Sequence, residues 1–173
     1  RKIRNYLHIF QDKNVGYSYL FTFKFAICAT ILVNVLSLLL ACALNAKIGC
    51  KNFLKAVFFL PYMLGTLIIS YVFKYIFANL IPVLGKALGI AALSNNVLGT
   101  GNAWIGVLVV TIWQSMAFNT LIYLSGLQTV DRDLYEAAAL DGATGFRRFF
   151  QITFPLIAPF FTINMVLSGK NYL

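Results

Sequence analysis

The chain has 173 residues, of which 60% are hydrophobic and 11% charged, and its formal net charge is +9. Soluble domains carry about 25% charged residues. A soluble domain of this size could not bury so much apolar surface, so the composition excludes an ordinary soluble enzyme and indicates a lipid bilayer as the solvent. The basic residues are scattered between apolar runs, which is typical of membrane proteins and argues against a nucleic-acid partner.

Four apolar segments are long enough to cross a bilayer, which requires about 20 helical residues. They span residues 25–44, 56–77, 103–127 and 152–168. We predict that each is helical, because lipid offers no hydrogen-bond partner to open backbone groups. The predicted fold is all-α: one polytopic transmembrane helical bundle over residues 1–173. The sequence opens on Arg1 instead of Met, so we expect a partial domain, a fragment with four spans.

The first two segments contain few polar residues. Asn34 and Ser37 lie in the first segment, and Pro61, Gly65 and Lys74 lie in the second. Because Lys74 is close to the end of its segment, we expect its ammonium group to reach the membrane surface. The link 45–55 is short and basic, whereas the link 80–102 is predicted to be a loop with a short interfacial helix.

The third segment carries a polar stripe with a spacing of four residues. Its members are Thr111, Ser115, Asn119 and Tyr123, with Trp113 and Gln114 nearby. Hydrogen bonds between neighbouring helices would explain such a stripe. Hydroxyl and amide groups beside aromatic rings also suit a path for a sugar. The candidate path residues are Trp113, Ser115, Asn119 and Tyr123.

The link 128–151 gathers four of the five acidic residues of the chain, Asp131, Asp133, Glu136 and Asp141. Asp131 or Thr129 can cap a helix that includes 135–140, and Gly142 is a suitable left-handed stop. A second short helix is predicted from about residue 143 to residue 151. Its phenylalanines at 146, 149 and 150 share one face by their spacing. We therefore predict two short helices joined by a glycine elbow.

The residues of this link match a known pattern. Three residues separate Glu136-Ala137-Ala138 from Gly142, and nine more separate Gly142 from Ile152. The pattern resembles the EAA motif of ABC importer permeases, although Phe154 replaces the leucine that the motif places before Pro155. The surrounding residues are most similar to permeases of the carbohydrate-uptake branch, such as those of maltose and oligosaccharide systems.

The resemblance implies a type I ABC importer permease-like bundle in the bacterial cytoplasmic membrane. It implies that link 128–151 is a cytoplasmic coupling loop that docks on a nucleotide-binding ATPase subunit. The implied docking residues are Glu136, Ala137, Ala138, Asp141, Gly142, Arg147 and Arg148. The further partners that it implies are a second permease subunit in a heterodimer, an extracellular or periplasmic solute-binding protein and a sugar. ATP would be used by the partner subunit, with no cofactor in this chain.

Catalytic motifs are missing from the sequence. We therefore expect that the chain is not an enzyme and that it holds neither catalytic residues nor a metal site. An alternative is a secondary transporter of the major facilitator type, because Asp141–Arg148, read DGATGFRR, partly echoes the loop signature of that class. A membrane-embedded enzyme is a third, weaker interpretation.

Overall fold

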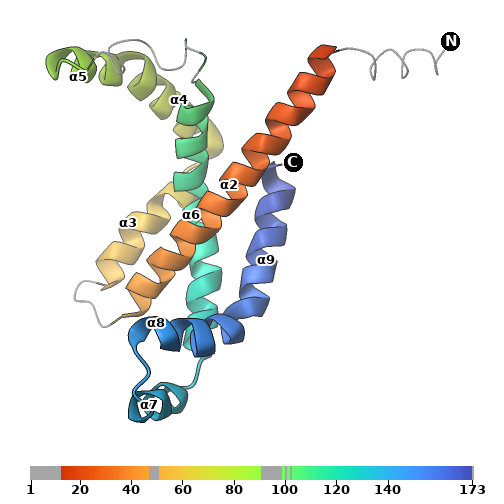
Figure 1. Ribbon diagram of the computed structural model, residues 1–173. Helices are drawn as coiled ribbons and strands as arrows, with labels where there is room; N and C mark the ends of the chain where they lie inside the picture. The colour runs from red at the N-terminus through yellow and green to blue at the C-terminus, as the bar shows by residue number, and fades with distance from the viewer. Residues whose placement is uncertain (1–12, 47–50, 91–98, 100, 102, 173) are drawn as a thin grey trace.

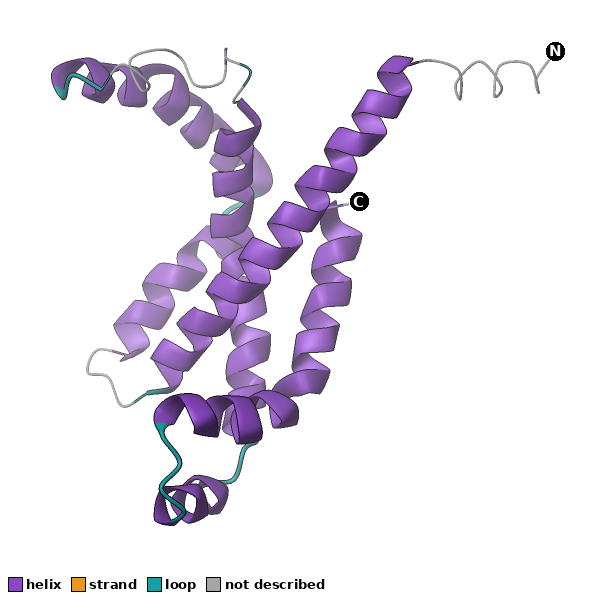
Figure 2. Ribbon diagram, in the orientation of Figure 1, coloured by secondary structure: helices purple, strands orange, loops and turns teal. Residues whose placement is uncertain are grey.

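The computed structural model describes residues 13–46, 51–90, 99, 101 and 103–172. All regular structure in this part of the chain is helical (Figure 2). Four helical stretches are long and apolar enough to cross a membrane: Asn14–Asn45, Thr66–Ala87, Ala103–Gln128 and Gly145–Tyr172. The predicted all-α transmembrane bundle is therefore confirmed.

Three helices form the centre of the bundle. They are α2 (Lys13–Asn45), α6 (Ala103–Gln128) and α9 (Phe154–Tyr172). Helix α2 crosses α6 diagonally, α9 packs beside both, and the N-terminal end of α2 projects beyond the bundle (Figure 1). The end of α2 and the segment between α6 and α9 lie at one end of the molecule, as the alternation of spans requires.

The face that α2 turns inward is distinguished by small side chains. Those buried are Ala26, Ala29, Thr30, Val33, Asn34, Ser37, Ala41 and Leu44. They recur every three or four residues, which places them on one face of the helix. Bulky residues such as Ile27, Ile31 and Leu39 face away from the bundle. In lipid, the hydrophobic effect does not drive one apolar helix face against another. Membrane helices associate through close packing instead, and small residues allow their backbones to approach closely.

Several hydrogen bonds join α2 to α6 inside the bundle. The Tyr123 hydroxyl donates to Oδ1 of Asn34 at 2.6 Å. The Ser37 hydroxyl donates to the Met116 carbonyl at 3.4 Å, and the Thr120 hydroxyl donates to the Ser37 carbonyl at 3.4 Å. The sequence alone assigns no role to Asn34 and Ser37, and the structure shows that they bind the neighbouring helix.

The second predicted segment, 56–77, differs from what the structure shows. Two helices replace it, α3 (Lys51–Met63) and α4 (Thr66–Tyr75), with a break at Leu64 and Gly65. Gly65 is extended, with φ −61° and ψ 142°, so it starts α4 as its N-terminal cap. Helix α4 continues through a π-helical turn, η1 (Ile76–Leu80), into α5 (Ile81–Ala87). The long apolar helix therefore begins ten residues later than predicted.

The later start changes the setting of Lys74 and of the link that follows. Lys74 is exposed in the last turn of α4, but the helix continues beyond it, so it does not mark the end of a span. A short interfacial helix was predicted within 80–102; α5 lies there, but it is the end of the apolar stretch Thr66–Ala87 and extends away from the bundle (Figure 1). Most of the remaining link lies outside the described residues.

Helices α6 and α9 approach each other most tightly at Gly126. A Cβ atom there would lie 2.7 Å from two ring carbons of Phe160, closer than real Cβ contacts allow. A residue larger than glycine at position 126 would therefore not fit between α6 and Phe160 as they are packed.

Gly126→Ala should lower the stability of the assembled protein, because Phe160 or the whole of α9 must shift to admit the methyl group. Overpacking of this kind costs about 1–3 kcal/mol. Thermal unfolding in detergent measures it. Gly169→Ala, on α9, is the control, since nothing lies within 4 Å of its Cβ position. Equal melting temperatures for the two variants would contradict the proposed close contact.

Candidate functional site

The link after α6 folds into two short helices joined by a glycine elbow. The first is α7 (Arg132–Leu140), and Oδ1 of its cap, Asp131, accepts the Asp133 N–H at 3.2 Å. Gly142 has φ +69°, and the N–H of Ala143 donates to the Ala138 carbonyl at 2.9 Å, which closes the helix. Both the cap and the left-handed stop are confirmed, because each depends on local sequence.

The second helix is not the separate short helix that was predicted. It runs over α8 (Gly145–Arg148) and continues as a π-helical turn, η4 (Phe149–Thr153), directly into α9. Its phenylalanines do share a face, since the ring of Phe150 stacks on Phe146 at 6.3 Å and meets Phe149 edge-on at 5.2 Å. The link therefore passes from α8 into the bundle helix α9 without an intervening loop.

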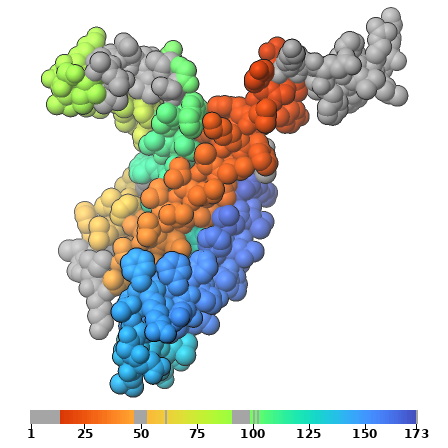
Figure 3. Space-filling model, in the orientation of Figure 1, coloured from red at the N-terminus to blue at the C-terminus, as the bar shows by residue number. Residues whose placement is uncertain are grey.

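Most of the predicted docking residues are accessible on this elbow. Ala138 is buried and Arg148 partly buried, whereas the exposed ones are Glu136, Ala137, Asp141, Gly142 and Arg147. Leu140 is 90% exposed and Phe146 is 81% exposed, so two large apolar side chains flank the glycine. The elbow forms the lower end of the molecule (Figure 3). A polar, protruding surface with two bare apolar residues has the character of a protein contact.

A tyrosine on the inner side of α7 fastens the elbow to the bundle. The Tyr135 hydroxyl lies 3.0 Å from the hydroxyl of Thr153, and the Arg148 guanidinium lies 5.8 Å from the centre of the Tyr135 ring. Arg147 instead donates to Gln151 at 3.0 Å. The contact between Tyr135 and Thr153 was missed from the sequence. The only available signals were that Tyr135 precedes Glu136 and that Thr153 lies at the start of the last span.

A polar cavity lies against the middle of α6. It measures about 510 Å³ and opens where the chain breaks between α3 and α4. Its lining is Tyr62, Met63, Leu64, Gly65, Thr66, Gln114, Ser115, Phe118, Asn119 and Asn171. The Tyr62 and Phe118 rings stack at 5.6 Å beside the amides and hydroxyls. The sequence indicated Ser115 and Asn119 but missed the residues from the helix break, because a span assumed to be continuous has no such opening.

The polar stripe of α6 does not stay on one face. Ser115 and Asn119 reach the cavity, whereas Tyr123 is fully buried against α2. Trp113 packs edge-on against Phe73 at 5.3 Å. The four candidate path residues are thus brought to three different surroundings.

Asn119 is also held from behind by α9. Its backbone carbonyl accepts from Nδ2 of Asn164 at 3.1 Å, and its Oδ1 accepts from the Ser168 hydroxyl at 3.3 Å. Its own Nδ2 donates to the Ser115 carbonyl at 2.9 Å. The cavity wall at Asn119 is therefore hydrogen-bonded to α9.

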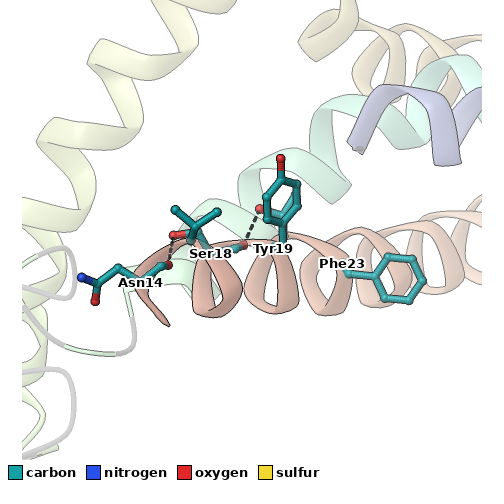
Figure 4. A pocket seen from close by; sticks show the side chains of 6 residues that line it. Asn14, Ser18, Tyr19 and Phe23 are labelled. Carbon is teal, nitrogen blue, oxygen red and sulfur yellow. Dashed lines mark hydrogen bonds between the residues drawn. The ribbon is translucent and has the colours of Figure 1, made fainter. Parts of the chain in front are cut away.

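Two other features carry less information. A hollow of about 520 Å³ beside the N-terminal end of α2 is lined by Asn14, Ser18, Tyr19 and Phe23 among others (Figure 4). Its recorded hydroxyl bonds run along the helix itself, as from Ser18 to the Asn14 carbonyl at 2.9 Å, so it is one helix face without a second wall. Among the described residues, no three metal-binding side chains gather at one place.

Comparisons with known proteins agree with the helical arrangement. Residues 33–169 match the family described as binding-protein-dependent transport system inner membrane component. The chain is 31% identical over 169 residues to a probable starch degradation products transport system permease, AmyD of Thermoanaerobacterium thermosulfurigenes, covering 98% of this chain and 58% of that protein. It is 36% identical over 169 residues to the multiple sugar-binding transport system permease MsmF of Streptococcus mutans, covering 97% of this chain and 58% of that protein.

A solved structure has the same fold. The chain superposes with a TM-score of 0.80 on a chain of a bacterial ABC transporter for the acidic polysaccharide alginate, solved in complex with a pentasaccharide-bound periplasmic protein. The two are 19% identical, and the match covers 94% of this chain and 58% of that one. The chain thus spans somewhat more than half the length of the proteins it matches. These matches give the major facilitator alternative no support. From the family match and the shared fold together, the chain is a member of the binding-protein-dependent transport system inner membrane components.

Proposed function

We propose that this chain forms the core of a permease subunit of an ATP-driven importer for a sugar or oligosaccharide. A separate ATPase subunit docks on the elbow at the cytoplasmic face, a second permease subunit completes the path, and a solute-binding protein delivers the sugar from outside. ATP is bound and hydrolysed by the partner.

The protruding elbow is the observation that carries this proposal. Glu136 is exposed on α7 and offers a carboxylate to a basic partner residue, while Leu140 and Phe146 offer apolar contact on either side of Gly142. Small Ala137 lets another backbone come close. An ion pair at such a rim contributes about 1 kcal/mol or less, so the apolar residues and the shape of the elbow supply most of the affinity.

The polar cavity supports a sugar as the cargo. Hydroxyl groups of a sugar need both donors and acceptors, which the amides of Gln114, Asn119 and Asn171 supply together. Stacked Tyr62 and Phe118 present apolar surface to the C–H face of a sugar ring. In the part of the chain that the structure describes, the residues that line the cavity include no charged side chain. Since an anion would need a cation there, this lining favours an uncharged sugar over an acidic one such as the alginate of the structural relative.

Replacing Gln114 tests the path directly. Gln114→Ala in the full-length assembled transporter should raise the sugar concentration at half-maximal uptake about three- to tenfold, as expected for one lost hydrogen bond. Assembly should be normal. Asn119→Ala should reduce uptake and also lower the melting temperature, because Asn119 both faces the cavity and binds α9.

Ser125→Ala is the matched control for both variants. Ser125 lies on the same helix and is exposed, and its hydroxyl bonds only along that helix, to the Leu121 carbonyl at 2.9 Å. It should transport like the wild type. If uptake at low sugar concentration stays normal in both Gln114→Ala and Asn119→Ala, the cavity is not the path.

A further inference from the structure

Tyr135 lies where the docking helix meets the bundle. The residue that follows it, Glu136, is exposed, whereas Tyr135 is partly buried and packs against the core cluster at the end of α6. Adjacent residues on α7 thus face two ways, one outward to a partner and one inward to the rest of the chain.

The inward contact reaches a residue of a different helix. The Tyr135 hydroxyl is 3.0 Å from that of Thr153, and Thr153 is only 5% exposed. Thr153 ends η4, which passes without interruption into α9. A bond at this point therefore holds the base of α9.

The far half of α9 holds the wall of the polar cavity. From Thr153 to Asn164 the helix rises roughly 16 Å at about 1.5 Å per residue. There Asn164 donates to the Asn119 carbonyl, and one turn later Ser168 donates to the Asn119 side chain. Both ends of α9 are therefore tied to functional elements, the base to α7 and the far half to the cavity.

Between these two ends α9 packs against both α6 and α2, and it meets α6 closely at Gly126, where the Phe160 ring lies against the glycine. Helix α9 is continuous over this stretch, with Pro159 inside it. A displacement at Thr153 can therefore be passed along α9 to Asn164 and Ser168.

We propose that Tyr135 is a positioning residue whose hydroxyl transfers the movement of α7 to α9 and so to the cavity wall at Asn119. This inference rests on the proposed function, because it assumes that an ATPase subunit moves α7. Arg148, on α8, lies 5.8 Å from the centre of the Tyr135 ring, so the ring contacts the helix before η4. The hydroxyl is the group that bonds to Thr153, at the base of α9.

Tyr135→Phe isolates that hydroxyl, because it keeps the ring and its contact with Arg148. We expect the full-length complex, reconstituted with its ATPase subunit and binding protein, to hydrolyse ATP at close to the wild-type rate. The sugar imported per ATP hydrolysed should fall roughly three- to tenfold, the size expected from one hydrogen bond. Thr153→Val should give the same loss, and the double variant should lose no more than either single one.

Two further variants separate transfer from stability. Thr153→Ser keeps a hydroxyl and should restore the wild-type ratio. Tyr71→Phe changes a tyrosine that is 74% exposed on α4 and should be silent. An unchanged sugar-to-ATP ratio in both Tyr135→Phe and Thr153→Val overturns the inference. A lower ratio in both also overturns it if the melting temperature of both complexes falls as well, because loss of stability then explains the result. If the wild-type complex itself neither binds an ATPase subunit nor imports sugar, the proposed function fails instead.

Discussion

Gly142→Asp is expected to leave the protein in the membrane but to abolish productive coupling to the ATPase subunit. Gly142 has φ +69°, and a side chain in this left-handed conformation costs about 1–2 kcal/mol. Among the described residues other than its chain neighbours, no atom lies within 4 Å of the Cβ position, so the new side chain would project into the space proposed for the partner. Strain and obstruction act together, and ATP-driven uptake in reconstituted complexes should fall roughly tenfold or more.

The chain supplies a matched control for this substitution. Gly89 has φ +70° and equally open surroundings, but it follows α5 at the other end of the molecule. Gly89→Asp carries the same backbone cost and should transport nearly normally. Gly142→Asn should be intermediate, because asparagine tolerates the left-handed conformation. Glu136→Ala should weaken coupling less than Gly142→Asp. Normal coupling in Gly142→Asp, or an equal loss in Gly89→Asp, would exclude the elbow as the docking element.

The second large effect is expected on stability, at Tyr123. Tyr123→Phe removes the donor to Oδ1 of Asn34, a residue that is 1% exposed. A buried acceptor left without its donor costs about 1–3 kcal/mol. The melting temperature of the complex should fall, while the half-saturating sugar concentration stays unchanged, because Tyr123 lies away from the cavity lining.

A double-mutant cycle checks the assignment of this bond. Asn34→Leu removes the acceptor, so adding Tyr123→Phe to it should cost much less than Tyr123→Phe alone. Tyr75→Phe, at a tyrosine that is 66% exposed, is the control. An unaltered melting temperature in Tyr123→Phe, or a changed half-saturating concentration, would return Tyr123 to the candidate path.

The elbow could be predicted from the sequence because its determinants are local. The Asp131 cap and the Gly142 stop each act within a few residues, so a single stretch of sequence contains the whole signal. The break at Gly65 was harder to place. Glycine and proline are tolerated inside membrane helices, so their presence in an apolar run does not decide between a bend and a break.

The packing of the bundle could be predicted only in part. The inner face of α2 combines small residues such as Ala29 with the polar Asn34 and Ser37, whereas the outward face carries larger apolar residues such as Ile31. The polar stripe on α6 suggested one shared path for Ser115, Asn119 and Tyr123, but the structure places Tyr123 apart from the other two for a geometric reason. Each step of four residues drifts about 40° around a helix, so Tyr123 faces α2 although Ser115 faces the cavity. The Tyr135–Thr153 contact joins residues that are distant in sequence and individually ordinary.

The most direct test of the docking site is a cross-link. A photoreactive residue placed at Leu140, which is 90% exposed beside the elbow, should form an adduct with the ATPase subunit in intact membranes. The same residue at Leu88, which is 70% exposed just after α5, should form none, because α5 and the elbow lie at opposite ends of the molecule (Figure 1). An ATPase adduct from Leu88 and none from Leu140 would contradict both the docking site and the orientation of the chain.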